Sequence, residues 1–288
     1  MPEVTVVIPT FNRSETILRA VGSVLSQTHT DLELLVIDDG GSDATPETLA
    51  RIADPRVRLL HHPHNRGAAA ARNTGIQAAR GAFVAFLDSD DQWLPRKLEL
   101  QLAALKDAPS DKAVSCHGVH MHLLDHGIER DQPLGSSADW KLRLTLGCDL
   151  SPGATLLARR EAFARVGLLD EALPRFEDWD WLLRYACAEG RVLALRECLA
   201  HVWNRRGHMG DQYEMSVRRF AVKHAALYAG LPAPLRRQAL CDIWLQVSGT
   251  YGFGGRYGDA GRTALRAASY RPLHCAFRVL RHFRSRIR

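Results

Sequence analysis

The sequence of 288 residues lacks the features that mark membrane and secreted proteins. A membrane-spanning helix needs about 20 consecutive apolar residues, and aliphatic runs such as 4–8 and 82–87 are far shorter. The chain enters the first of these runs within a few residues of Met1. That leaves no room for the charged and apolar regions of a secretory signal peptide. We therefore expect no transmembrane segment and a cytoplasmic location.

Paired cysteines are also missing. The chain has six cysteines, but none forms a C-x-x-C pair. Such pairs are typical of zinc sites and redox motifs, and closely spaced cysteines are typical of disulfide frameworks. The scattered cysteines predict reduced, mostly buried thiols and neither a zinc site nor a set of disulfides.

The charge is distributed unevenly. Residues 1–204 carry 22 Lys and Arg against 28 Asp and Glu, whereas residues 205–288 carry 16 against 4. No recognition motif accompanies this basic charge, so we do not expect nucleic-acid binding. The basic stretch 278–288 also contains interleaved apolar residues, and such a stretch can rest on anionic lipid. An oligomer contact and a solvated tail are the alternatives.

The first part of the chain alternates apolar strands with helical patterns. Strands are predicted at 4–8, 33–37, 57–60 and 82–87, with helices that start near Ile17 and cover about 68–79. This alternation predicts an α/β fold with a parallel, doubly wound sheet. The later pattern predicts helices near 95–106 and 179–188, strands near 112–116 and 191–195, a loop over 117–139, and mainly helices after about 205.

Acidic residues follow the predicted strand 82–87 directly. Asp88, Asp90 and Asp91 lie on one turn, and gathering like charges is unfavourable unless a cation or partner compensates them. Mn²⁺ or Mg²⁺ prefers oxygen ligands and often completes its shell with substrate phosphates. The turn therefore predicts a metal and diphosphate site, and the alternative is a solvated turn that caps the helix near Pro95.

Three further segments contain candidate binding or catalytic residues. Asp39 ends the second strand, where a carboxylate can accept hydrogen bonds from a base or ribose or can simply form a turn. Arg72 lies in a small-residue helix whose N-terminus suits an anion, and it can instead pair with an acid. Glu177 and Asp178 stand among aromatic residues at a helix start, where an acid can act as a general base or merely favour the helix. His61, His62 and His64 are predicted to lie at the surface without a ligand role. No ligand role is expected for His117, His120 and His122 either.

Together, five ordered motifs resemble the family-two glycosyltransferases of the GT-A fold. They are Val-Val-Ile-Pro-Thr-Phe-Asn-Arg (6–13), Val-Ile-Asp-Asp-Gly (36–40), Asn-Arg-Gly to Gly-Ile (65–76), Phe-Leu-Asp-Ser-Asp-Asp-Gln-Trp (86–93) and Glu-Asp-Trp-Asp (177–180). The resemblance implies a Rossmann-like, mostly parallel central sheet in a domain covering residues 1–205. In that domain, 1–91 would bind the nucleotide and 92–205 the acceptor. Residues 206–288 would form a basic, mainly helical region.

The resemblance also implies a role for each candidate residue. Asp178 would be the catalytic base with Glu177 supporting it, and Asp90 would ligate Mn²⁺ or Mg²⁺. The nucleotide, a diphosphate such as UDP, would contact Pro9, Thr10, Asn12, Asp39, Arg72, Asp88 and Ser89. The segment Asn204 to His208 matches a loop that closes over the donor in such enzymes, so Arg205, Arg206 and His208 are further candidates or simply solvated charges.

These residues predict an inverting transfer of a sugar from a nucleotide diphosphate to a glycan or lipid-linked acceptor, at or near the inner face of the membrane. A Gln-x-x-Arg-Trp motif, which accompanies processive synthesis, is not present in the sequence. Single-sugar transfer for a cell-surface polysaccharide or glycolipid is therefore favoured. The alternatives are sugar-phosphate nucleotidyl transfer, which usually needs a Gly-rich loop after the first strand, and a non-catalytic nucleotide-sugar binder.

Overall fold

The computed structural model describes residues 1–108, 113–124, 127–204 and 209–277. They divide into two compact units. Unit 1 consists of residues 1–140, 149–172 and 177–204, as far as these are described, and unit 2 consists of 141–148, 173–176 and the described part of 205–288. The candidates Arg205, Arg206 and His208 and the basic stretch 278–288 lie outside the described residues. The boundary at residue 205 stays a prediction.

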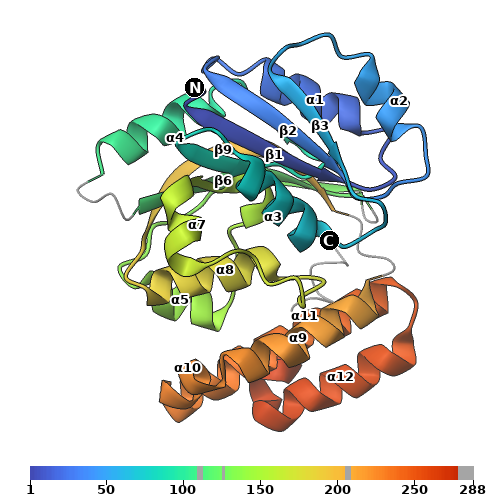
Figure 1. Cartoon of the computed structure of the whole chain (residues 1–288). Coiled ribbons are helices and arrows are strands. Elements are labelled where there is room, and N and C mark those ends of the chain that lie inside the picture. Colours follow the sequence, from blue (N-terminus) through green and yellow to red (C-terminus); the bar gives the residue numbers. More distant parts are fainter. Residues whose placement is uncertain (109–112, 125–126, 205–208, 278–288) are drawn as a thin grey trace. The chain divides into compact units, whose positions relative to one another are not determined.

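Unit 1 is built on one mixed sheet (Figure 1). Among the described residues the strand order is β3-β2-β1-β4-β8-β6-β9-β5, with β7 paired to β6. Strands β3, β2, β1 and β4 are parallel, β8 runs antiparallel to β4 and β6, and β9 runs parallel to β6. The strands are β1 (Val4–Thr10), β2 (Leu32–Asp38), β3 (Val57–His61), β4 (Phe83–Phe86), β5 (Gln92–Trp93), β6 (Ala113–Leu123), β7 (Ile128–Gln132), β8 (Leu157–Arg159) and β9 (Arg191–Asn204).

Helices cover both faces of this sheet. On one face, Val4, Val6 and Ile8 of β1 share a core with apolar residues of α1 and α4. On the other face α3 lies so close to β1 that a Cβ at Gly75 would stand 2.3 Å from Val7 Cγ1. The helices of unit 1 are α1 (Ile17–Leu25), α2 (Thr45–Ala50), α3 (Ala68–Ala78), α4 (Lys97–Lys106), α6 (Pro152–Thr155), α7 (Arg160–Val166) and α8 (Glu177–Cys187).

The alternation of side chains along β1 explains this layering. Successive residues of a strand point to opposite faces, and every residue of β1 and β2 is buried. The two central strands therefore read as continuous apolar runs, as expected for parallel strands covered on both sides. The alanines of α3 and Gly75 let that helix approach the sheet closely. The α/β fold with a mostly parallel sheet is confirmed.

The predicted loop over 117–139 is wrong for much of its length, because β6 continues to Leu123 and β7 covers Ile128–Gln132, whereas residues 133–139 contain no helix or strand. Gly118 suggested a turn, but its lack of a side chain serves close packing. A Cβ there would lie 2.8 Å from the Cα of Pro133. The pairing of β6 with β9 also shifts register beside Gly118. The irregular, histidine-rich sequence is thus a strand in the middle of the sheet.

The described residues of unit 2 after 208 include the helices α9 (Gly210–Lys223), α10 (Ala225–Gly230), α11 (Ala233–Phe253) and α12 (Tyr257–Tyr270), and residues 272–277 are helical as well. It also includes most of α5 (Trp140–Leu146). A Cβ at Gly210 would stand 2.3 Å from the ring of Tyr251, so α9 and α11 are in close contact. The prediction of a mainly helical region is confirmed for the part that is described.

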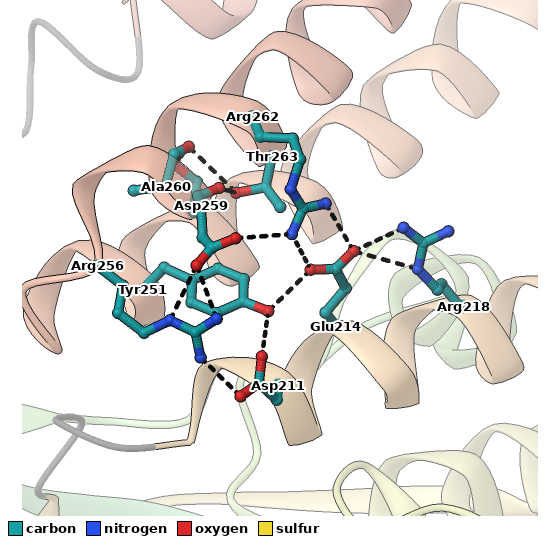
Figure 2. Close-up of polar contacts among 10 residues, drawn as sticks. Asp211, Glu214, Arg218, Tyr251, Arg256, Asp259, Ala260, Arg262 and Thr263 are labelled. Atoms are coloured by element: carbon teal, nitrogen blue, oxygen red, sulfur yellow. Dashed lines mark hydrogen bonds and ion pairs between the residues drawn. The ribbon is translucent and has the colours of Figure 1, made fainter.

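A polar network joins α9, α11 and the start of α12 (Figure 2). Glu214 accepts hydrogen bonds from Arg218, Arg262 and Tyr251. The hydroxyl oxygen of Tyr251 also lies 2.9 Å from Oδ1 of Asp211, so the two carboxylates share this one donor. Although α9 and α12 are exposed on one side, the carboxylate of Glu214 is 10% exposed. A nearly buried charge of this kind is stabilising only when several donors surround it.

No helix among the described residues combines the length and the apolar character that crossing a bilayer requires. None of the six cysteines, all of which lie among the described residues, forms a disulfide bond, and the thiols of Cys116, Cys241 and Cys275 are buried.

Candidate functional site

Arg72 connects two acidic segments that are far apart in the sequence. Its guanidinium donates to Asp88, just after β4, and to Glu177, the first residue of α8. Arg72 is 3% exposed. Burial alone would lower the pKa of Arg72, but the charges of Asp88, Glu177 and Asp178 raise it above its ordinary value. The arginine is therefore a fixed cation that holds the predicted catalytic and nucleotide-binding acids together.

Asp178 lies in the same cluster and is positioned by backbone groups. Its Oδ2 accepts the N–H of Gly153 at 2.9 Å, and its Oδ1 accepts the N–H of Trp179 at 2.7 Å. A Cβ at Gly153 would lie 2.9 Å from Arg72 Nη2 and 3.0 Å from Asp88 Oδ2. Glycine is therefore required where α6 approaches the cluster. Sequence patterns did not single out Gly153, because no motif connects it to α8.

The environment of Asp178 alters its acidity. Burial raises the pKa of Asp178 above its ordinary value, and the charge of Asp88 raises it further, while Arg72 and the two backbone N–H groups act in the opposite direction. A carboxylate with a raised pKa is a better proton acceptor at neutral pH. The arrangement suits a general base.

The acidic turn after β4 presents its carboxylates differently. Asp91 is 3% exposed and accepts the N–H of Trp203 at 3.0 Å. The side chains of Asp88 and Asp90 are 40% and 33% exposed. Asp90 lies 3.3 Å from Arg13. Burial and the charges of Asp88 and Asp90 raise the pKa of Asp91 well above its ordinary value.

This turn fits a hard divalent cation. Asp88 and Asp90 offer accessible oxygens, and Asp91 adds a third acid behind them, so a cation would relieve their mutual repulsion. Arg19 supports the turn by donating to the carbonyl oxygen of Asp90, and its guanidinium stacks 3.8 Å from the ring of Trp203. Asp91 was predicted as a member of this acidic turn without a role of its own, and Arg13 and Arg19 were given no role in the site.

Asp39, predicted to meet the base, is occupied by backbone donors at the start of α3. Its carboxylate accepts the N–H of Gly67 at 2.7 Å and the N–H of Arg66 at 3.0 Å. It also lies 2.6 Å from His62 Nδ1. Asp39 therefore holds the loop that leads into α3 and to Arg72. A contact with a base stays a prediction.

The prediction that His62 lies at the surface is wrong. His62 is 8% exposed, and its second ring nitrogen lies 2.9 Å from the hydroxyl of Thr74. Both ring nitrogens thus have a partner, which is what a buried imidazole requires. His61 and His64 are exposed as predicted.

The remaining candidates lie at the ends of β1 and β4. Asn12 adopts a left-handed conformation with φ of 53°, and its Oδ1 accepts the N–H of Ser42 at 2.8 Å. Pro9, Thr10 and Ser89 are buried. The carbonyl oxygen of Thr10 accepts the N–H of Asp39 at 2.8 Å. These contacts bring the polar ends of β1 and β2 together, as expected for a ligand site beyond the strand ends.

The sequence model of the glycosyl transferase family 2 matches residues 5–166. The chain belongs to this family. Among its relatives of known name, the chain is 44% identical over 102 residues to WfgD of Escherichia coli, a UDP-Glc:alpha-D-GlcNAc-diphosphoundecaprenol beta-1,3-glucosyltransferase. It is 45% identical over 114 residues to the succinoglycan biosynthesis protein ExoO of Rhizobium meliloti. These matches cover 35% and 40% of this chain and 40% and 33% of those proteins.

Solved structures support the GT-A fold of this family member. S. aureus TarS in complex with UDP-GlcNAc superimposes with a TM-score of 0.64 at 19% identity and covers 93% of this chain and 91% of that one. The mannosyltransferase PcManGT from Pyrobaculum calidifontis, in complex with GDP-Man and Mn²⁺, gives a TM-score of 0.61 at 18% identity, with 100% and 81% covered. At this identity the likeness concerns the fold alone.

Proposed function

We propose that this family 2 member transfers a single sugar from a nucleotide diphosphate to an acceptor hydroxyl with inversion of the anomeric centre. The observation that carries the proposal is the cluster of Arg72, Asp88, Glu177 and Asp178. It joins the acidic turn after β4 to the start of α8. A donor diphosphate at the turn and an acceptor hydroxyl at α8 would then be neighbours. Such proximity is the main requirement for a direct displacement.

Asp178 is the proposed general base. As the acceptor oxygen attacks the anomeric carbon, Asp178 takes the hydroxyl proton, and the bond to the diphosphate breaks on the opposite face. The hydrogen bonds from Gly153 and Trp179 fix the carboxylate in one orientation. Positioned general bases contribute about 10²- to 10⁴-fold in rate. In this scheme Glu177 does not accept the hydroxyl proton of the acceptor. It supports Asp178 by neutralising Arg72 and anchoring the start of α8.

Asp90, with Asp88, is the proposed holder of Mn²⁺ or Mg²⁺. The bound cation would neutralise the charge that grows on the leaving diphosphate. Arg13 lies beside Asp90 and would contribute a second positive charge to the diphosphate. The accessible carboxylate oxygens and the buried acid behind them support a metal at this turn.

The donor nucleotide is proposed to be UDP, because WfgD, a relative named for transfer from UDP-glucose, is 44% identical to this chain over 102 residues. The alternative base is guanine, since PcManGT is described with GDP-Man. The acceptor is proposed to be a glycan or a glycan carried on a lipid diphosphate, as in the name of WfgD. With such an acceptor, sugar transfer would take place at the cytoplasmic face of the membrane, and this location stays a prediction.

Isothermal calorimetry with UDP, GDP, dTDP and CDP, each with and without Mn²⁺, tests the donor site. We expect UDP to bind at least about tenfold more tightly with Mn²⁺ than without it. Binding of GDP instead would redirect the search for the sugar. If folded protein binds none of the four, the chain is a non-catalytic relative and the proposal fails.

A further inference from the structure

A second group of metal-ligating side chains lies on β6, β7 and β9 of unit 1. His120 on β6 is paired across the sheet with Asp131 on β7 and with His201 on β9. Cys198, also on β9, is paired with Gly118. The register shift beside Gly118 brings the thiol toward the same place as His120. Three chain segments thus contribute side chains to one point of the sheet.

The distances within this group are those of a nearly formed metal site. One ligand atom each from His120, Asp131 and Cys198 lies within 4.8 Å of the others. The Nδ1 of His120 stands 2.6 Å from Oδ1 of Asp131. Zinc bonds of roughly 2.0 to 2.3 Å in a tetrahedral arrangement separate ligand atoms by roughly 3.5 Å. Rotations of partly exposed side chains suffice to reach that spacing from the distances observed.

The chemistry of the donors selects the metal. An imidazole nitrogen, a thiolate sulfur and a carboxylate oxygen suit Zn²⁺, whereas Mg²⁺ and Mn²⁺ prefer oxygen alone. The acidic turn Asp88 to Asp91 offers only oxygens, so the two places differ in the cation they favour. We propose that His120, Asp131 and Cys198 form a Zn²⁺ site in this protein, with the fourth position left to water or a small ligand.

A second layer of side chains supports these ligands. The ring of His201 stacks on that of His120 with centroids 4.8 Å apart, and His201 Nδ1 lies 2.9 Å from His122 Nε2. His122 in turn contacts Glu129 at 3.0 Å. Such outer contacts orient the first ligands of metal sites. The ring of His122 also stacks on that of Trp203. The backbone N–H of Trp203 donates to Asp91, so these outer contacts extend to the acidic turn.

Binding would release a proton. The thiol of Cys198 must become a thiolate, so Zn²⁺ displaces its proton to solvent while the sulfur–metal bond forms.

Zinc titration of tag-free protein tests the site, with bound metal measured by competition against a chromophoric chelator. The Asp90→Ala variant serves as the background, since it removes the main alternative carboxylate ligand, and one Zn²⁺ per chain is expected to remain. In that background, Cys198→Ser and His120→Ala should each weaken zinc binding at least about tenfold. The matched control Cys187→Ser, which removes an exposed thiol elsewhere in unit 1, should not change it.

Cobalt gives an independent readout of the sulfur ligand. Co²⁺ bound to the wild-type protein should show a thiolate-to-cobalt charge-transfer band, which Cys198→Ser loses and Cys187→Ser keeps. Asp131→Asn, a change at an exposed strand position, provides a second ligand variant if Cys198→Ser does not fold. The proposal is overturned if the ligand variants bind Zn²⁺ as tightly as the background, or if Asp90→Ala alone abolishes zinc binding. The first result would mean that His120 and Asp131 form only a cross-strand ion pair.

Discussion

Arg72 and Glu177 form a buried ion pair between positions 105 residues apart in the sequence. Because both side chains are under 10% exposed, removing one partner leaves an uncompensated charge. Losing one member of a buried pair typically destabilises a protein by about 3 to 5 kcal/mol. We expect Arg72→Ala to lower the free energy of unfolding by about that amount in urea titrations.

The matched control is Arg66→Ala. Arg66 pairs with Glu171, but both side chains are more than 40% exposed. Exposed pairs contribute about 0 to 1 kcal/mol, and the contact of Arg66 with Asp39 uses its backbone N–H, which alanine retains. Equal destabilisation by the two variants would contradict the central position of Arg72.

The pH dependence of sugar transfer should reflect the ionisation of the Asp178 carboxyl group. The base must be ionised to accept a proton, and burial raises its pKa above the ordinary value. We expect kcat/KM to fall about tenfold per pH unit on the acid side, starting at a pH above about 4, the usual range of an aspartate. Asp178→Asn should reduce kcat by about 10²- to 10⁴-fold while the Kd of the donor changes little.

Asp180 offers a comparison on the same helix. Its carboxylate is fully buried but pairs with Arg184 at 2.8 Å. Asp180→Asn should therefore affect the free energy of unfolding more than the shape of the pH–rate profile. An acid limb that persists unchanged in Asp178→Glu and a near wild-type rate in Asp178→Asn would rule out Asp178 as the base.

Metal dependence should be traceable to the acidic turn. Asp90→Ala removes the side chain that is proposed as the main ligand of the cation, and its carboxylate is 33% exposed. We expect the gain in UDP affinity from Mn²⁺, measured by calorimetry, to shrink at least about tenfold. Glu99→Gln, an exposed acid on α4, is the control and should keep the full Mn²⁺ effect. If the Mn²⁺ effect is unchanged in Asp90→Ala, Asp90 is not the ligand and another acid of the turn must hold the metal.

Local patterns were sufficient to predict the sheet but not the contacts between distant segments. The strands 4–8 and 33–37 were predictable because buried parallel strands are continuous apolar runs. The start of strand β6 was predicted near 112–116, but its continuation to Leu123 was missed because Gly118 and the histidines resemble a loop, although Gly118 serves a close backbone approach. The spacing of apolar residues shows which face of a single strand or helix is buried, and it carries no information on such tertiary packing.

The candidate site was predictable as a set of acids at strand ends, yet their pairing was not. Asp39 was a reasonable candidate for a base contact, but its carboxylate is engaged by the N–H groups of Arg66 and Gly67. Gly153 carried no signal, since a glycine in a short helix resembles any turn residue. Its place against Arg72 and Asp88 became visible only through the packing of α6.

Unit 2 should be sensitive to acid through Glu214. Hydrogen bonds from Arg262, Arg218 and Tyr251 lower the pKa of Glu214 to about 2, against an opposing effect of burial. A carboxylate with a lowered pKa in the folded state contributes stability above its unfolded value, near 4.5, and loses it as the pH falls toward 2. Because the arginines are half-exposed, we expect Glu214→Gln to lower the free energy of unfolding by about 1 to 2 kcal/mol at pH 7.

The pH series makes this prediction specific. The difference between Glu214→Gln and the wild type should fade between pH 4.5 and 2, because the wild-type carboxyl then becomes protonated as well. Arg237→Gln, an exposed change on α11, should have little effect at either end of the range. A constant difference across this range would show that the loss comes from packing rather than from the charge of Glu214.

Lys97 should destabilise the fold at low pH. Its side chain is fully buried, its Nζ lies 3.6 Å from the ring centroid of Trp93, and no hydrogen-bond partner is found for Nζ among the described residues. Burial lowers the pKa of Lys97 well below its ordinary value. A base with a lowered pKa in the folded state releases its proton on folding, so stability increases as the pH rises toward the unfolded pKa of about 10.4.

Replacing Lys97 by methionine removes this proton linkage while keeping most of the side-chain volume. We expect Lys97→Met to raise the free energy of unfolding at pH 7 by on the order of 1 to 4 kcal/mol, as when buried charged groups are replaced by apolar residues. The gain should shrink as the pH approaches 10. Lys106→Met, at an exposed position on the same helix, controls for the loss of one positive charge. If Lys97→Met destabilises the protein at every pH, the ammonium group must be charged and bound in the folded state.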